Sequence, residues 1–205
     1  MKLIDKEYFW NNLSKPILPL SQSQKSNIDK IIDYYDENSM MNLRCFASLL
    51  AQIRVESANT YNSIREYGSY KYFKYLIGKL GIKTLQQAWE YRGFGHIQIT
   101  GIINFNNFTE ILSEKYGEFV NVWKIANDNV DTNYRFKISL DIAFIGCENG
   151  YFTGKKLGDY FTDSKTDWFN ARRVVNPGEI KRKPKKVWEM VEVSKKFYKA
   201  LEFRQ

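Results

Sequence analysis

Two glutamates and a hydroxyl-bearing ribbon are the residues of this chain whose types and spacing favour chemistry. Glu56 closes an apolar helical pattern, and Glu66 follows it in the polar segment SIREYGS. A glycine-punctuated run, YRGFGHIQITG, then brings a hydroxyl at Thr100, and an amide follows at Asn104. Two carboxylates, a hydroxyl and an amide around one cleft are what hydrolysis of a sugar–sugar bond requires. The residues therefore suggest a glycoside hydrolase.

The element that must position Glu56 is a helix predicted from apolar residues at spacings of three and four. These residues are Leu43, Phe46, Ala47, Leu50 and Ile53. A carboxylate at the C-terminal end of a buried helix faces the negative end of the helix dipole and is partly desolvated. Both effects disfavour ionisation, as the proton-donating role of a general acid requires. An ordinary surface glutamate at a helix end would show the same pattern.

Glu66 is expected in a loop that folds back over the cleft, because Gly68 lies close by and the surrounding residues are polar. A solvated loop charge is the alternative interpretation. The segment that includes these residues, 58–90, is rich in Tyr and Lys and is expected to form loops and short helices.

Residues 91–101 alternate polar and apolar side chains between glycines, which predicts a short strand or hairpin arm. Gln98 and Thr100 would lie on one face of the strand, and Ile97 and Ile99 on the other. The same alternation is typical of any half-buried strand, so it does not by itself indicate a site.

The other elements are predicted from periodicity and from capping signals. Ser21 with Gln24 forms a capping-box pattern that opens a helix. A short helix or arm is expected within residues 1–20, ended by Pro16 and Pro19. Further helices are expected over residues 102–116 (with Asn104 in the first turn), 134–148, 152–161, 167–175 and 185–203, with an irregular segment at 120–132 and a turn at 176–178. Together with the length, these patterns predict a single, mainly helical domain over residues 1–205.

The charge of the chain is unevenly distributed. The net charge is +8, and basic residues crowd the C-terminal third. They are Lys155, Lys156, Arg172, Arg173, Lys181, Arg182, Lys183, Lys185 and Lys186. A cluster of one sign favours an anionic partner such as nucleic acid, a membrane surface or an anionic cell-wall polymer. No known nucleic-acid-binding motif accompanies the cluster, so we do not expect nucleic acid as the partner.

Several other chemistries are not supported by the residue inventory. Cys45 and Cys147 lie in apolar helical patterns and are expected to be reduced, buried thiols. His96 is the only histidine, which argues against a multi-histidine metal site, and no zinc-binding spacing is present. A Ser–His–Asp triad would have to use His96, yet no serine-elbow motif surrounds it. We therefore expect no metal and no cofactor.

The N-terminal segment MKLIDKEYFW lacks the uninterrupted apolar core of a secretory signal. No stretch reaches the length needed to span a bilayer. The protein is accordingly expected to be made in a cytoplasm and delivered by another agent if it acts outside.

Taken together, the motifs resemble the chitinase-like glycoside hydrolase family 19, in particular its bacteriophage endolysin branch. The family has a Glu followed by Ser or Thr at a helix end, a second acidic residue in a loop, a Y-x-G-R-G-x-x-Q-[LI]-[ST] segment and an Asn four residues later. The corresponding residues are Glu56-Ser57, Glu66, the run 91–100 and Asn104. The stretches GYFTGKKLGDYF, DWFNARRVVN and LSQSQKSNIDKIID also resemble stretches of phage members, in the same order. The resemblance thus covers nearly the whole chain.

The resemblance implies a lysozyme-like, two-lobed helical domain with a small β-hairpin beside the active-site cleft. It implies an inverting hydrolysis of a β-1,4 bond next to an N-acetylated sugar. Glu56 would be the general acid, Glu66 the general base that activates a water, and Thr100 would help to hold that water. Inverting enzymes keep the two carboxyl groups roughly 6.5–9.5 Å apart to leave space for the water.

The same resemblance implies the residues that bind substrate. Gln98 and Asn104 would hydrogen-bond the N-acetyl and hydroxyl groups of the sugars. Asn176 would line the far lobe of the groove, and Tyr91 would be structural or would face a sugar.

Two positions depart from the family pattern. Phe94 stands where the glycine motif usually has Arg, and Pro177 follows Asn176 where Gly is usual. The loss of the Arg removes a cation near the site, for which Arg92 could substitute. An altered cleft, weaker activity or a binding-only descendant would each be consistent with this change.

The expected function is that of a peptidoglycan-degrading lysin, acting after holin-type release or from a virion, as a monomer without a separate wall-binding domain. The basic C-terminal third would then suit anionic cell-wall polymers. A chitinase acting on poly-N-acetylglucosamine and a catalytically silent wall-binding protein are the alternatives.

Overall fold

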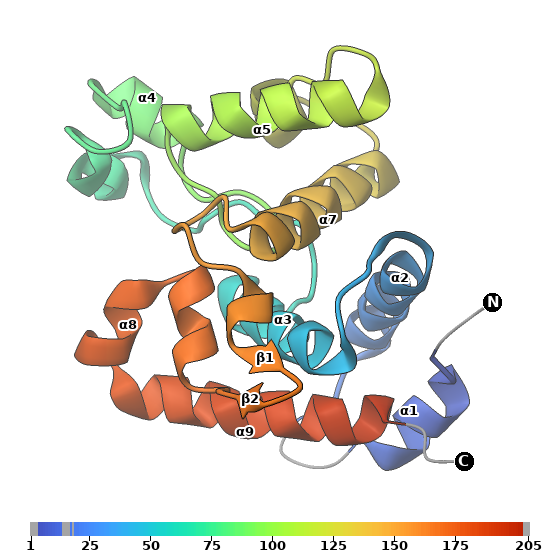
Figure 1. The fold of residues 1–205 in the computed structure, drawn as a ribbon. Helices are drawn as coiled ribbons and strands as arrows, with labels where there is room; N and C mark the ends of the chain where they lie inside the picture. Colours follow the sequence, from blue (N-terminus) through green and yellow to red (C-terminus); the bar gives the residue numbers. More distant parts are fainter. Residues whose placement is uncertain (1–3, 14–16, 18, 203–205) are drawn as a thin grey trace. The chain divides into compact units, whose positions relative to one another are not determined.

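The computed structural model describes residues 4–13, 17 and 19–202. It is mainly helical with one small two-stranded antiparallel sheet, which confirms the predicted mainly helical class (Figure 1). The chain folds into two units: unit 1 consists of Met1–Tyr61 and Phe144–Gln205, and unit 2 of Asn62–Ala143.

Unit 1 is built mainly from long helices. Its elements are α1 (Lys6–Asn12), α2 (Gln22–Asn38), α3 (Leu43–Glu56), the last residues of α7 (Thr132–Asn149), the 3₁₀ helices η2 (Leu157–Asp159) and η3 (Asn170–Val174), strands β1 (Phe161–Thr162) and β2 (Lys165–Thr166), α8 (Pro177–Arg182) and α9 (Pro184–Leu201). The predicted capping box of α2 is present: the Gln24 amide N–H donates to Ser21 Oγ at 3.2 Å, and the Ser21 N–H donates to Gln24 Oε1 at 2.7 Å.

The core of unit 1 forms around α3, which packs against α9 (Figure 1). Phe46, Leu50 and Ile53 of α3 are fully buried, as its periodicity predicts. On α9, Val187, Met190 and other apolar residues face inward, as expected for the amphipathic helix predicted over 185–203. This packing fixes the end of α3, and therefore the backbone of Glu56.

Unit 2 combines short and long helices. They are η1 (Tyr70–Leu76), α4 (Leu85–Glu90), α5 (Ile102–Tyr116), α6 (Val122–Asn127) and the part of α7 up to Ala143. A cluster of Phe73, Leu76, Ile82 and Ala88 packs with partly buried side chains that include Tyr91. The bounds of α5 agree with the prediction.

The ribbon at residues 91–101 differs from the strand that its alternation predicts. It contains only isolated bridges, from Arg65 to Phe94 and from Phe94 to Ile99. Gln98 has a φ of 56° and Gly95 a φ of 86°, so the chain turns instead of extending. The two-stranded sheet of the molecule lies elsewhere, where Phe161 pairs with Thr166.

Four further local predictions need correction. Pro177 begins α8 instead of forming part of a turn, because the fixed φ of proline suits the first position of a helix. The segment predicted to be irregular, 120–132, contains α6, whose N-cap Asn121 accepts from the Lys124 N–H. The helices expected at 152–161 and 167–175 are short 3₁₀ helices, η2 and η3.

Other predictions are confirmed or lie outside the described residues. Cys45 and Cys147 are buried free thiols, as predicted. Pro16, the predicted end of the N-terminal arm, and Phe203, the predicted end of the last helix, lie outside the described residues.

Candidate functional site

The first candidate residue, Glu56, is the last residue of α3, as predicted. Its carboxylate forms an ion pair with Arg172, whose side chain is only 1% exposed, whereas that of Glu56 is 17% exposed. Gln52 lies one turn before Glu56 and its Oε1 is 3.5 Å from Nη1 of the same guanidinium. Besides the helix end and the burial that the sequence predicts, this carboxylate therefore has a buried positive charge beside it.

Arg172 is held by a second carboxylate, Glu179 of α8. Its Nε and Nη2 donate to Glu179 Oε2 at 2.9 and 2.7 Å, and Lys186 Nζ donates to Glu179 Oε1 at 2.8 Å. A buried guanidinium is tolerated only when it is paired and hydrogen-bonded, and these contacts satisfy that requirement. The result is a chain of alternating charges from Glu56 through Arg172 and Glu179 to Lys186.

The pKa of Glu179 reflects this arrangement. Burial by itself raises the pKa of a carboxyl group, but the hydrogen bond from Lys186 and the charge and hydrogen bonds of Arg172 outweigh burial. The pKa of Glu179 is therefore lower than its ordinary value. This carboxylate stays ionised and holds Arg172 in place.

The turn after Glu56 has an unusual backbone. Ala58, Asn59 and Tyr61 have φ values of 51°, 64° and 54°, in the left-handed region. A non-glycine residue in this region costs roughly 1–2 kcal/mol, least for asparagine, and such residues cluster at functional sites. The turn is fixed from α2, because the Gln24 Nε2 donates to the Asn59 carbonyl at 2.6 Å and the Asn27 Nδ2 donates to the Thr60 carbonyl at 3.1 Å.

In unit 2, Glu66 is anchored through both of its carboxylate oxygens. The Tyr75 hydroxyl donates to Oε1 at 3.0 Å, and the Gly93 N–H donates to Oε2 at 3.1 Å. The backbone N–H of Glu66 also donates to the Gly93 carbonyl at 2.8 Å. Glu66 is thus a half-buried, oriented carboxylate and not a freely solvated loop charge.

The neighbours of Glu66 have perturbed pKa values. Burial and then the negative charge of Glu66 raise the pKa of Tyr75, so its hydroxyl remains a donor throughout the neutral range. Burial and then the charges of Arg92 and Arg135 lower the pKa of Arg65 to about 9. The guanidinium of Arg65 donates to backbone carbonyls, including that of Glu90 at 2.7 Å. Arg65 therefore holds the loop and does not hold the Glu66 carboxylate.

The glycine motif has a steric explanation at Gly93. A Cβ at this position would lie 2.6 Å from Gln98 Oε1 and 3.0 Å from Glu66 Oε2. The first distance is shorter than real Cβ atoms show and the second is tight, so an added Cβ would push back the ends of the Gln98 and Glu66 side chains that glycine allows to approach the ribbon backbone.

The predicted substrate-binding amide Gln98 is largely engaged in holding the ribbon. Its Nε2 donates to the carbonyls of Ile64 at 3.0 Å and Gly95 at 2.7 Å. Two further predicted residues follow it: Thr100 Oγ1 donates to the Gln98 carbonyl at 3.1 Å, and Asn104 Nδ2 donates to the Thr100 carbonyl at 2.8 Å. Thr100 and Asn104 are half-buried, so both keep part of their surface in solvent.

The remaining predicted residues lie in different units. Tyr91, in unit 2, packs edge-on against Phe105 with ring centroids 5.2 Å apart. Asn176, in unit 1, joins the two charged partners through its backbone: its N–H donates to the Arg172 carbonyl at 2.9 Å and its carbonyl accepts from the Glu179 N–H at 3.2 Å.

Phe94 stands at the position where the family that the sequence resembles usually has Arg. It is 1% exposed, and its ring centroid lies 6.2 Å from that of Phe105. Arg92 does not take over as a partner of the Glu66 carboxylate: its Nε donates to the Glu66 backbone carbonyl at 3.3 Å and its guanidinium stacks 3.8 Å over the Trp89 ring. The ribbon therefore carries an aromatic core residue where a cation is usual.

Sequence reasoning missed Arg172 and Tyr75 as partners of the two glutamates. It also missed Glu179 as a partner of Arg172 and Lys186 as a partner of Glu179. A signal for Arg172 was present, because it lies between the apolar residues Ala171 and Val174, both of which are fully buried. Neither Glu179 nor Tyr75 carries a comparable local signal.

Among the residues that the structure describes, no group of three or more His, Cys, Asp or Glu side chains could hold a metal ion. None of the helices in the described ranges has both the length and the apolarity needed to cross a membrane.

Comparisons with protein-family models, with curated proteins and with solved structures found no match for this chain.

Proposed function

We propose that this chain is a peptidoglycan-degrading glycoside hydrolase of the family 19 type, cleaving β-1,4 bonds between N-acetylated sugars with inversion. One observation carries the proposal. Within each unit, stretches far apart in the sequence that resemble the family come together at a glutamate: Glu56 meets Arg172 in unit 1, and Glu66 meets Gly93 in unit 2.

In this mechanism the protonated form of Glu56 donates its proton to the leaving glycosidic oxygen, and the ion pair with Arg172 is that of the carboxylate that remains. The Arg172 guanidinium then stabilises the carboxylate that this transfer leaves behind. Because Arg172 is fixed by Glu179, its charge is already in position when the proton moves, and no reorganisation is required.

Glu66 accepts a proton from the attacking water on the opposite face of the sugar. Its two anchors, the Tyr75 hydroxyl and the Gly93 N–H, hold the carboxylate in one orientation. The Thr100 hydroxyl donates to the Gln98 carbonyl, and its oxygen can accept a hydrogen bond from the water. Asn104 and the side-chain oxygen Oε1 of Gln98 are left to bind sugar substituents. The proposal further requires a lysozyme-like arrangement in which both glutamates reach the same bond.

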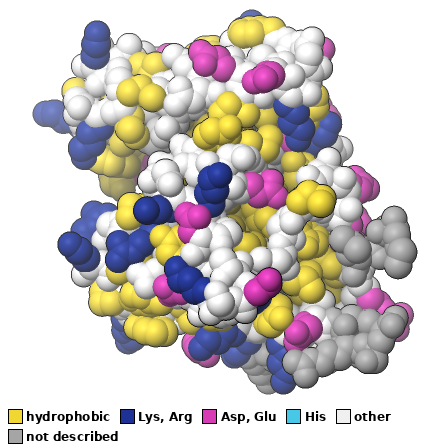
Figure 2. Space-filling model, in the orientation of Figure 1, with side chains coloured by type: hydrophobic (Ala, Val, Ile, Leu, Met, Phe, Trp, Pro, Cys, Tyr) yellow, Lys and Arg dark blue, Asp and Glu magenta, His cyan; other side chains and the backbone are white. Residues whose placement is uncertain are grey.

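The basic surface of unit 1 supports an anionic wall polymer as a partner. Residues 181–186 are all exposed and include Lys181, Arg182, Lys183, Lys185 and Lys186. Figure 2 shows Lys and Arg side chains gathered over the region that α8 occupies in Figure 1. Attraction of this kind between exposed charges weakens as salt rises. The proposal places the protein at the cell wall after holin-type release or in a virion.

The test is release of new reducing ends from purified peptidoglycan by the wild-type protein. Glu56→Gln and Glu66→Gln should each abolish that release while binding to the wall persists. Glu192→Gln, at an exposed position of α9, is the matched control and should retain full activity. Unchanged activity of Glu56→Gln would remove the assignment.

A catalytically silent wall-binding protein is the second candidate, favoured by the buried Phe94 in place of a cation. Such a protein would pellet with cell walls but release no sugar ends. A chitinase would instead turn over purified chitin at least as well as peptidoglycan.

A further inference from the structure

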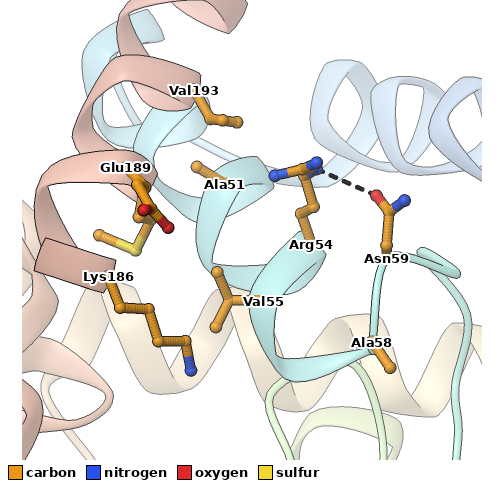
Figure 3. Close-up of a pocket in the computed structure, with 9 residues that line it drawn as sticks. Ala51, Arg54, Val55, Ala58, Asn59, Lys186, Glu189 and Val193 are labelled. Carbon is orange, nitrogen blue, oxygen red and sulfur yellow. Dashed lines mark hydrogen bonds between the residues drawn. The ribbon is translucent and has the colours of Figure 1, made fainter. Parts of the chain in front are cut away.

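A pocket of about 290 Å³ lies between α3 and α9 in unit 1 (Figure 3). Its lining residues are Ala51, Arg54 and Val55 of α3, Ala58 and Asn59 of the following turn, and Lys186, Glu189, Met190 and Val193 of α9. Its volume is near the lower limit of ligand pockets, which typically span about 300–1,000 Å³. The pocket therefore suits a small branch of a ligand better than a chain of sugar rings.

The pocket is connected to the candidate acid. Val55 lines the pocket and is the residue before Glu56 on α3. On the other wall, Lys186 donates to Glu179, the carboxylate that fixes Arg172 beside Glu56. The pocket and Glu56 thus share one rigid framework within unit 1.

The lining combines an apolar floor with charges of both signs. Ala51, Val193 and Met190 are buried, whereas Glu189 is exposed at the rim. Arg54 is oriented by its Nε–H bond to Asn59 Oδ1 at 3.0 Å, drawn as the dashed line in Figure 3. Glu189 forms no ion pair with any residue in the described part of the chain.

These groups complement a short peptide. Small apolar side chains fit the floor, carboxylates fit the two cations Arg54 and Lys186, and an ammonium group fits Glu189. The peptides of peptidoglycan carry all three kinds of group on a lactyl-bearing sugar. Chitin offers only neutral acetyl groups, which would leave the charges at the rim unused.

We infer that the α3–α9 pocket binds the peptide substituent of peptidoglycan and makes peptide-bearing strands the preferred substrate. This inference rests on the proposed function for its account of the substrate. The peptide is the feature that distinguishes peptidoglycan from chitin, and the two glutamates alone do not discriminate between these polymers.

The activity test compares intact peptidoglycan with the same material after an amidase has removed its peptides. The wild-type protein should cleave the intact strands with a higher kcat/KM. Glu189→Lys should lower kcat/KM on intact strands about three- to tenfold, because it replaces a rim attraction with a repulsion, and should leave peptide-free strands unaffected. Glu192→Lys makes the same charge change at an exposed site of the same helix and should affect neither substrate. Equal rates on both substrates would overturn the inference while leaving the proposed hydrolase intact.

A binding test stands apart from activity. In Glu56→Gln protein labelled with ¹³C-methyl methionine, the Met190 signal should shift when a soluble disaccharide-tetrapeptide with a free ammonium group is added. The peptide-free disaccharide should not shift it, and Glu189→Lys should weaken the response. Met40, which is 99% exposed and lies outside the pocket, is the internal reference. If the protein released no sugar ends, the proposed function would fail, and an unshifted Met190 signal would separately refute the pocket assignment.

Discussion

The guanidinium of Arg172 pairs with the carboxylate of Glu56, 116 residues earlier in the chain. Because Arg172 is almost fully buried and is shared with Glu179, it links the end of α3 to α8. The stability of unit 1 and the orientation of its candidate acid therefore depend on the same side chain.

Arg172→Met should destabilise the protein strongly. The change leaves the buried carboxylate of Glu179 with Lys186 alone and removes the partner of Glu56. Removing one member of a buried ion pair typically costs about 3–5 kcal/mol. Urea unfolding measures the loss. Arg173→Met is the matched control, since Arg173 is only half-buried and its Nε donates to Asn170 Oδ1 at 3.0 Å; it should cost far less.

The dependence of stability on pH should include a contribution from Glu179. Its pKa is lower in the folded protein than its ordinary value of 4.5, so the folded state binds fewer protons than the unfolded state. The stabilisation is present above pH 4.5 and is lost as the pH falls through the folded-state pKa. Glu179→Gln should flatten this acid limb in chemical unfolding measured at a series of pH values. An unchanged slope would contradict the arrangement around Arg172.

Gly93→Ala should disrupt the ribbon of unit 2, because the added Cβ meets Gln98 Oε1 and the Glu66 side chain. Overpacking of this kind costs about 1–3 kcal/mol, and activity should fall further because Glu66 is displaced. Gly158→Ala is the control, since a Cβ there meets nothing within 4 Å. Thermal unfolding and reducing-end assays of both variants check the prediction; equal behaviour of the two would be evidence against it.

Tyr75→Phe should lower kcat without unfolding unit 2. Tyr75 is 46% exposed, so the variant loses little packing, but the Glu66 carboxylate loses one of its two hydrogen-bond donors. The loss of a hydrogen bond worth about 0.5–1.5 kcal/mol corresponds to a decrease in kcat of about two- to twelvefold. Tyr72→Phe removes a hydroxyl from the neighbouring exposed ring, whose centroid is 5.5 Å away, and should behave like the wild-type protein. A wild-type kcat for Tyr75→Phe would show that the hydroxyl does not position Glu66.

The helices that carry local signals could be predicted from the sequence. The capping box at Ser21 and the apolar periodicity of α3 and α5 gave correct elements, and Glu56 was placed correctly at a helix end. The prediction of a turn at residues 176–178 was wrong, because Asn176-Pro177 is equally typical of a turn and of a helix N-terminus, and α8 begins at Pro177. The ribbon was predicted as extended because alternation does not reveal the left-handed φ of Gln98.

The partners of the two glutamates could not be predicted in the same way. Whether an arginine in a basic cluster is buried depends on which residues the fold brings to it, and for Arg172 these come from α3 and α8. The bond from Tyr75 to Glu66 likewise depends on how η1 packs. Long-range contacts of this kind leave no periodic trace in the sequence.

Nuclear magnetic resonance of the products during early hydrolysis of a β-1,4-linked peptidoglycan strand tests the central claim most directly. If Glu56 is the general acid and Glu66 the general base, the new reducing end appears first as the α-anomer, and neither Glu56→Gln nor Glu66→Gln forms it. A product that appears first as the β-anomer, or a Glu66→Gln variant that retains wild-type rates, would contradict the account.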